Sequence, residues 1–159
     1  MKMKSSFVSN MFRASLSGMA IALAVAPPSA AQTKPLGANL ERFDYPYPVQ
    51  WYEASSQGAT VRMAYMDIKP EKVGNGRTVI LLHGKNFCAA TWGDTARTLA
   101  ASGYRVIVPD QIGFCKSSKP SGYQYSFHAL TSLTAGLLDA AKAGKVTLIG
   151  HSTGGILAS

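Results

Sequence analysis

Cysteine, acidic residues and long apolar runs are all scarce in this sequence. Only 2 of the 159 residues are cysteine, which excludes a small domain held together by many disulfides. Charged residues make up 15% and apolar residues 47%, which excludes an intrinsically disordered chain and leaves material for one hydrophobic core. The 8 acidic residues stand against 16 Lys and Arg, so the net charge is +8. Such an excess can indicate nucleic-acid binding, and its position along the chain therefore matters.

The positive charge does not follow the pattern of a nucleic-acid-binding surface. Lys2, Lys4 and Arg13 precede an apolar stretch, and no acidic residue occurs before Glu41. The remaining excess is scattered, without a basic stripe or interleaved aromatic residues, so we expect no nucleic-acid partner. The sequence also lacks a metal-spaced set of His and Cys and a phosphate-binding glycine loop. Neither a metal nor an organic cofactor is therefore predicted.

Residues 1–31 have the pattern of a secretory signal peptide. A basic start is followed by the apolar run Met19–Ala26, two prolines and small residues up to Ala31, which predicts cleavage after Ala31. The alternative is an uncleaved membrane anchor, but the run is much shorter than the roughly 20 residues that cross a bilayer. We therefore expect an exported, periplasmic or extracellular protein without a stable membrane anchor. Export makes a disulfide between Cys88 and Cys115 chemically permissible.

The chain after the signal peptide changes organisation near residue 77. Residues 32–48 are rich in Pro and Tyr and predict an extended segment, and the alternating runs Val49–Ala54 and Val61–Ile68 predict a β-hairpin. Continuous apolar runs then alternate with stretches of helical period, which is typical of a parallel sheet covered on both faces. The apolar runs are 79–82, 106–108 and 146–149, and the helical stretches are 92–100 and 126–141. We predict a mostly parallel, doubly wound α/β sheet with an N-terminal β-hairpin.

The segment after the third apolar run has the form of a turn that carries a nucleophile. It reads Gly150-His151-Ser152-Thr153-Gly154-Gly155 and continues into an apolar helical stretch. The pattern G-x-S-x-G is weak alone, but between a strand and a helix it is typical of a strained, exposed serine. Gly150 and Gly154 allow the strand and the helix to approach closely. Ser152 is therefore the candidate nucleophile, and the alternative is an ordinary glycine-rich turn.

The loop after the first apolar run is the candidate partner of that serine. His83 and Gly84 end the run, and an oxyanion hole needs two N–H donors that converge on one oxygen. We predict the backbone N–H of Thr153 as one donor and that of Lys85 as the other, with that of Asn86 as the alternative. His83 could act as the base, but its place at the root of the loop favours a supporting role through hydrogen bonds.

With these segments in this order and at this spacing, the chain resembles the α/β-hydrolase superfamily. The matching pieces are LLHGKNFCAATW (Leu81–Trp92), GYRVIVPDQIGFCKSSKP (Gly103–Pro120) and VTLIGHSTGG (Val146–Gly155). The resemblance implies a serine-dependent hydrolase that acts on an ester, amide or thioester carbonyl of a small molecule, or less often on a carbon–carbon bond. A serine at this turn argues against the haloalkane dehalogenases and epoxide hydrolases of the superfamily, which use aspartate there.

The same resemblance gives the two cysteines a specific setting. The loop after the second apolar run usually reads D-x-x-G-x-G in the family, and Cys115 takes the place of the second glycine. The strands that precede Cys88 and Cys115 are neighbours in the family, so both thiols emerge on the active-site face. A disulfide between them is favoured over two free thiols, and it would fix the loop Lys85–Phe87.

One departure from the family pattern concerns the catalytic triad. The family order is Ser, then Asp or Glu, then His, yet no acidic residue and no histidine follows Ser152 in this sequence. Asp110 occupies a structural position of the family, His151 is expected to point away from the serine into packing, and His128 is expected on a helix. We therefore expect residues 49–159 to form the N-terminal half of a hydrolase domain that is inactive alone. The alternative is a catalytically inactive fragment or a non-catalytic binding protein of the same fold.

Overall fold

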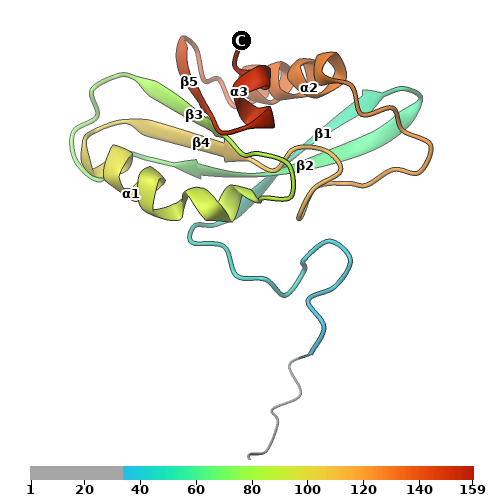
Figure 1. Ribbon diagram of the computed structural model, residues 1–159. Helices are drawn as coiled ribbons and strands as arrows, with labels where there is room; N and C mark the ends of the chain where they lie inside the picture. The colour runs from blue at the N-terminus through green and yellow to red at the C-terminus, as the bar shows by residue number, and fades with distance from the viewer. Residues whose placement is uncertain (1–33) are drawn as a thin grey trace, which may run out of the picture. The chain divides into compact units, whose positions relative to one another are not determined.

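The computed structural model describes residues 34–159, which form a five-stranded sheet with helices on both of its faces (Figure 1). The predicted signal peptide and its cleavage site lie outside the described residues. Among residues 34–159, no helix has the length and apolar character that a membrane crossing requires. Residues 34–48 contain no helix and no strand, and turns occur in this segment at residues 38–39 and 41–42.

The antiparallel part of the sheet is the predicted hairpin of β1 (Val49–Ser56) and β2 (Ala59–Ile68). Its two-residue turn consists of Gln57 and Gly58, which both have positive φ, as the twist of a tight hairpin requires. The hairpin joins the rest of the sheet through β2, which pairs antiparallel with β4.

The parallel part of the sheet contains β3 (Thr78–Leu82), β4 (Arg105–Pro109) and β5 (Val146–Gly150). The strand order is β1-β2-β4-β3-β5, and β3 pairs in parallel with both β4 and β5. The predicted α/β class and doubly wound sheet are therefore confirmed. One detail differs, because β3 is buried throughout whereas Leu148 and Ile149 of β5 are each 38% exposed. Among the described residues β5 is an edge strand covered by a short helix, so its apolar run is not enclosed on both faces.

The helices fall on the two faces that the alternation of strand residues creates. A short 3₁₀ helix (Ala89–Trp92) leads into α1 (Gly93–Ala101) on one face, and α2 (Phe127–Ala140) and α3 (Thr153–Leu157) cover the other (Figure 1). The Ser126 hydroxyl accepts the N–H of Ala129 at 3.1 Å and caps the start of α2. The helix ends at Ala140, one residue before the end of the predicted helical stretch 126–141, and Lys142 beyond it has a φ of 50°.

Two hydrophobic cores lie on opposite faces of the sheet. Ile80 and Leu82 of β3 pack with the leucines of α2, whereas Val79 and Leu81 pack with the alanines of α1. Side chains of a strand alternate between the two faces of the sheet, so each face must be covered by its own helices. The carboxyl ends of β3, β4 and β5 meet at one edge of this double core, which is where the candidate site lies.

Candidate active site

Ser152 occupies the turn between β5 and α3 in a strained backbone conformation. Its φ is 54° and its ψ is −122°, a region that residues other than glycine rarely adopt. Such strain persists only where the surroundings enforce it, and it is frequent at functional sites. The serine is exposed to solvent. The local sequence therefore produces the conformation that the G-x-S-x-G turn predicts.

The flanking glycines explain how this strain is enforced. A Cβ atom on Gly150 would overlap the backbone carbonyl of Gly154, and a Cβ atom on Gly154 would overlap the carbonyl of Leu82. Both positions therefore exclude any side chain. With glycine at both, α3 starts directly against the end of β3, and Ser152 is pushed out of the turn.

The chain that follows β3 lies against the serine. Gly84 is buried, and a Cβ atom placed on it would lie 3.0 Å from Cβ of Ser152 and 3.0 Å from Nδ1 of His151. The structure thus brings the candidate oxyanion loop and the candidate nucleophile into direct contact. The loop runs past Lys85 and Asn86, both exposed, and Asn86 has a positive φ of 66°.

Several backbone N–H groups beside the serine are free to bind a ligand oxygen. Within residues 34–159, the N–H groups of Lys85, Asn86 and Thr153 donate to no other group of the protein. Thr153 is the first residue of α3, where an N–H has no partner inside the helix. Free donors at this position can stabilise an oxyanion. Lys85 and Asn86 both remain candidates for the second donor.

His83 is a buried brace between two loops. Its Nδ1 donates to the carbonyl of Gly84 at 2.8 Å, and its Nε2 accepts the N–H of Gln111 at 2.9 Å. Burial lowers the pKa of His83 below its ordinary value, so the ring stays neutral. Both ring nitrogens are occupied, which fits a supporting role better than that of a base. Gln111 was not predicted, because it acts through its backbone and its side chain gives no signal in the sequence.

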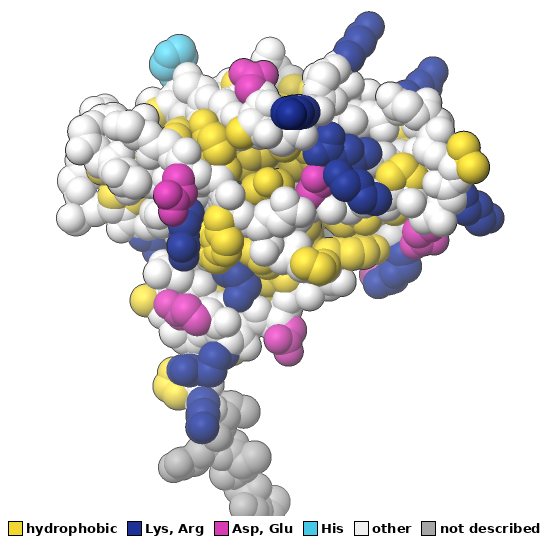
Figure 2. All heavy atoms as spheres, turned by 180° about the vertical axis from the view of Figure 1, so that it is seen from behind, with side chains coloured by type: hydrophobic (Ala, Val, Ile, Leu, Met, Phe, Trp, Pro, Cys, Tyr) yellow, Lys and Arg dark blue, Asp and Glu magenta, His cyan; other side chains and the backbone are white. Residues whose placement is uncertain are grey.

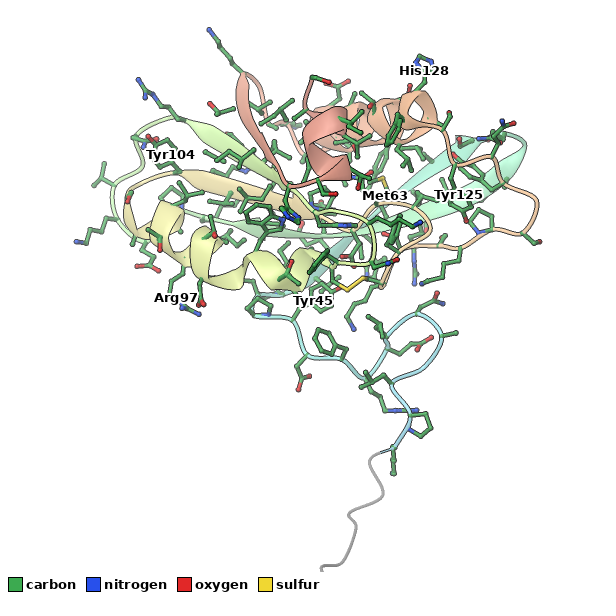
Figure 3. All side chains as sticks on the ribbon, in the orientation of Figure 1. Tyr45, Met63, Arg97, Tyr104, Tyr125 and His128 are labelled. Atoms are coloured by element: carbon green, nitrogen blue, oxygen red, sulfur yellow. A yellow bond between two sulfur atoms is a disulfide. The ribbon has the colours of Figure 1, made fainter. Side chains whose placement is uncertain are left out.

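The other two histidines lie at the surface. The expectation that His151 points into packing is wrong, because His151 is exposed and its ring meets Phe87 edge-on at 5.6 Å. The turn places it at the rim of a pocket of about 270 Å³, and Ser152 is not among the residues that line this pocket. The lining residues are His83, Gly84, Phe87, Thr91, Trp92, Thr95 and His151. His128 is exposed in the first turn of α2, as expected (Figure 3).

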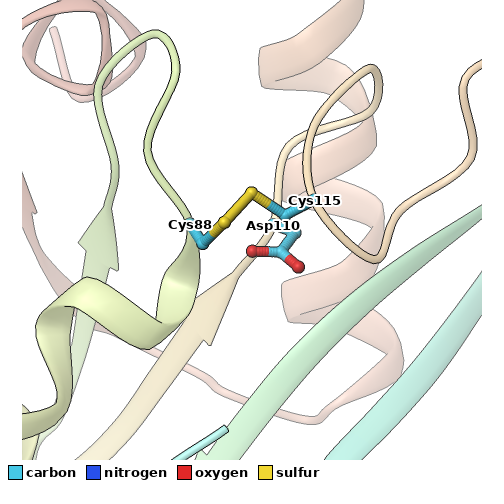
Figure 4. Close-up of side chains that lie close together, drawn as sticks. All are labelled: Cys88, Asp110 and Cys115. Atoms are coloured by element: carbon cyan, nitrogen blue, oxygen red, sulfur yellow. A yellow bond between two sulfur atoms is a disulfide. The ribbon is translucent and has the colours of Figure 1, made fainter. Parts of the chain in front are cut away.

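A disulfide joins the two loops that flank the site. Cys88 and Cys115 are bonded, with their Cα atoms 5.7 Å apart (Figure 4). Cys115 has a φ of 49°, a conformation that suits the glycine found at this place in the family pattern. Asp110 lies close to both sulfur atoms. Because the sulfurs are bonded to each other, they do not offer a metal the thiolates that it binds.

Asp110 is a buried hub that holds the same loops together. Its carboxylate accepts the N–H of Ala89 at 2.7 Å, the N–H of Lys116 at 3.0 Å and the hydroxyl of Tyr45 at 2.5 Å. Burial and the neighbouring carboxylate raise the pKa of Tyr45, so the phenol stays protonated and donates. Sequence reasoning missed Tyr45, since the Pro- and Tyr-rich segment around it predicted only a surface position.

The charged side chains show no single basic stripe on the face seen in Figure 2. Lys and Arg lie at several separate places there and alternate with acidic and hydrophobic groups. One basic group, Arg105, forms an ion pair with Asp67 at 2.8 Å. Burial pushes the pKa of Asp67 up, but hydrogen bonds from Arg105 and Lys69 outweigh it and hold the pKa below its ordinary value.

Comparison with known proteins places these features in a family. The model of the alpha/beta hydrolase fold family matches residues 77–159, more than half of the chain. The crystal structure of a probable hydrolytic enzyme from Pseudomonas aeruginosa PAO1 is similar to this chain, with 54% sequence identity and a TM-score of 0.73. The match covers 75% of this chain and 38% of that enzyme. The 2-hydroxy-6-oxo-2,4-heptadienoate hydrolase of Pseudomonas putida is 36% identical over 87 residues, 54% of this chain and 32% of that protein. Epoxide hydrolase A of Mycobacterium tuberculosis is 39% identical over 80 residues, 50% of this chain and 25% of that protein. The chain thus spans well under half the length of these relatives.

Proposed function

Because the chain belongs to the alpha/beta hydrolase fold family, we propose that it carries the nucleophile of a serine hydrolase that acts on an ester- or amide-type carbonyl of a small molecule. Two of its relatives are named as hydrolases, the 2-hydroxy-6-oxo-2,4-heptadienoate hydrolase and epoxide hydrolase A. The proposal of a serine nucleophile rests on Ser152 itself, which is exposed, has a φ of 54° and lies in contact with Gly84.

The chemistry follows from the groups around Ser152. A base removes the proton of the hydroxyl as Oγ attacks the carbonyl carbon, and the carbonyl oxygen becomes an oxyanion. The free N–H groups of Thr153 and Lys85 bind that oxygen. The intermediate then collapses, the bond to the leaving alcohol or amine breaks, and the protonated base gives that group its proton. Water, deprotonated by the same base, attacks the acyl-serine and releases the acid and the free hydroxyl of Ser152. Loss of one such donor slows an enzyme by about 10²–10³-fold.

The identity of the nucleophile favours a carbonyl substrate over an epoxide or a haloalkane. Relatives of this chain include epoxide hydrolases and a haloalkane dehalogenase. The branches of the superfamily with those activities carry aspartate at the position of Ser152. A serine hydroxyl forms an ester with an acyl group, which suits the cleavage of esters and amides.

We assign neither the base nor the acid of the triad to a residue of 34–159. His83 has both ring nitrogens in hydrogen bonds, and His128 lies in the first turn of α2. The exposed ring of His151 lies edge-on to Phe87 in the lining of the pocket, and Asp110 is occupied by three donors. Residues 34–159 alone are therefore expected to hydrolyse esters about 10⁴-fold or more slower than a complete triad.

A fluorophosphonate probe tests this proposal on protein isolated from its own organism. The probe should label Ser152, identified by mass spectrometry of the modified peptide, and the Ser152→Ala variant should stay unlabelled. Folded protein that is not labelled would contradict the proposal. That result would favour the alternative, a non-catalytic binding protein of the same fold.

We also propose that the protein is exported after cleavage following Ala31. The disulfide between Cys88 and Cys115 supports this proposal, since such bonds persist mainly in oxidising compartments. Protein recovered from the periplasm or the medium should begin at Gln32 when its N-terminus is sequenced. Recovery from the cytoplasm with Met1 in place would contradict it.

A further inference from the structure

The Cys88–Cys115 disulfide connects the candidate oxyanion loop to the loop after β4. Cys88 ends the stretch that begins at Gly84 and contains Lys85, while Cys115 lies beyond Asp110. Figure 4 shows the bond crossing between these two loops beside the Asp110 carboxylate. The bond is therefore placed to control the position of the backbone N–H groups just before it.

Apart from the His83 ring, which holds the carbonyl of Gly84, the oxyanion loop has few other constraints within residues 34–159. Its own hydrogen bond runs from the N–H of Phe87 to the carbonyl of Gly84 at 3.1 Å. The side chains of Lys85, Asn86 and Phe87 are exposed, and Asn86 adopts a left-handed conformation. A loop whose side chains are exposed keeps one shape only where its surroundings fix it.

Two tethers act in parallel on the end of this loop. The Asp110 carboxylate accepts the N–H groups of Ala89 and Lys116, which are the residues directly after the two cysteines. The disulfide fixes the cysteines themselves. When the disulfide opens, the carboxylate still holds the loops near each other. Reduction should therefore loosen the oxyanion loop without unfolding the sheet.

The disulfide is within reach of a reductant. Cys88 and Cys115 are both only half-buried. A thiolate of a dithiol attacks one sulfur and forms a mixed disulfide, and the other cysteine leaves as a thiolate. The second thiol of the reductant then displaces the first cysteine. Two electrons and two protons pass from the dithiol to the pair, which yields two cysteine thiols and an oxidised dithiol.

We propose that the Cys88–Cys115 disulfide is a redox-sensitive positioning bond of the active site. In the oxidised protein it holds the N–H of Lys85 toward the oxyanion, and reduction by a dithiol lets that donor move away. The proposal rests on the proposed function of Ser152, because the donor matters only where an oxyanion forms. Cys88 and Cys115 are positioning residues and do not touch the substrate.

The test compares oxidised protein with protein reduced by dithiothreitol, both isolated from the native organism. Reduction should lower kcat for p-nitrophenyl acetate about tenfold and leave KM within about twofold, as expected when a transition-state donor is misplaced. Amide hydrogen exchange of Phe87, whose N–H donates to the carbonyl of Gly84, should speed up, while far-ultraviolet circular dichroism, which reports the helices and strands, stays the same. The Cys88→Ser/Cys115→Ser variant should show the reduced values with and without dithiothreitol.

Two outcomes overturn the proposal. One is an unchanged exchange rate of Phe87 after complete reduction, and the other is a loss of the circular dichroism signal, which would mean general unfolding. Absence of ester turnover in the oxidised protein contradicts the proposed function of Ser152 instead. The exchange measurement then still shows whether the disulfide positions the loop.

Discussion

The two halves of the candidate site are held in place by different kinds of interaction. The turn that carries Ser152 depends on steric fit, because Gly150 and Gly154 leave no room for a side chain between β5, α3 and β3. The oxyanion loop depends on tethers, which are the Cys88–Cys115 disulfide and the Asp110 hydrogen bonds. A close-packed turn fails when one carbon atom is added, whereas a tethered loop weakens stepwise as each tether is removed.

Adding a methyl group to the turn should have the largest effect. Gly154→Ala places a Cβ atom on the carbonyl of Leu82, so we expect a loss of about 3–5 kcal/mol in the free energy of unfolding, measured with urea. Gly155→Ala is the matched control, because its Cβ atom would lie 3.7 Å from the nearest atom, the carbonyl oxygen of Gly150, at an ordinary contact distance. The control should change the free energy by less than about 1 kcal/mol. Equal losses of stability for the two substitutions would contradict the steric account of the serine turn.

Removing the covalent tether should have the next largest effect. The disulfide spans 27 residues, and Cys88→Ala/Cys115→Ala should lower the free energy of unfolding by about 3–4 kcal/mol. Cys88→Ala/Cys115→Gly should lose about 1 kcal/mol less, since glycine adopts the φ of 49° without strain. Urea unfolding of both variants measures the difference. A larger loss in the glycine variant would contradict the assignment of strain to Cys115.

Removing a polar tether should have a smaller effect. Tyr45→Phe deletes the hydroxyl that donates to Asp110 at 2.5 Å, and we expect a loss of about 1–2 kcal/mol. Tyr104→Phe serves as the control, because Tyr104 packs on the same core but its hydroxyl makes no hydrogen bond with residues 34–159. Thermal unfolding of the two variants gives the comparison, and a larger shift for Tyr104→Phe would count against the Asp110 hub.

The smallest effect on the free energy of unfolding is expected from a change of pH, which acts through His83 at the start of the oxyanion loop. Burial lowers the pKa of His83 below 6.5 in the folded protein, so between the two pKa values only the unfolded chain takes up a proton. Stability is therefore complete above about pH 6.5 and falls by up to about 1.4 kcal/mol per pH unit below it. Asp67 does not contribute in this range, because its folded pKa lies below 3.8.

Urea unfolding at about pH 7.5 and pH 5.5 measures this dependence. His83→Gln should flatten it, whereas His128→Gln should leave it as it is because His128 is exposed. A pH dependence that persists in His83→Gln would show that another group is responsible.

The strands and the serine turn could be predicted from sequence because their signals are local. Continuous apolar runs marked β3 and β4, and two glycines around Ser152 marked the strained turn. The partners that act across the fold could not be found in this way. Tyr45 and Asp110 are 65 residues apart, and the residues next to them in the sequence do not indicate that they are in contact.

The exposed positions were also difficult to predict, for a related reason. The apolar run of β5 predicted cover on both faces, but a strand's neighbours depend on the tertiary arrangement and not on its own residues. His151 was expected in packing because it adjoins the serine, yet the sharp turn presents it at a pocket rim beside Phe87.

The most direct measurement is a crystal structure of the protein after reaction with an alkyl fluorophosphonate, which mimics the tetrahedral intermediate. We expect a phosphorus atom bonded to Oγ of Ser152, with one phosphonyl oxygen about 2.7–3.1 Å from the N–H groups of both Thr153 and Lys85. A phosphonyl oxygen that meets neither N–H, or a phosphonate bonded to another residue, would contradict it.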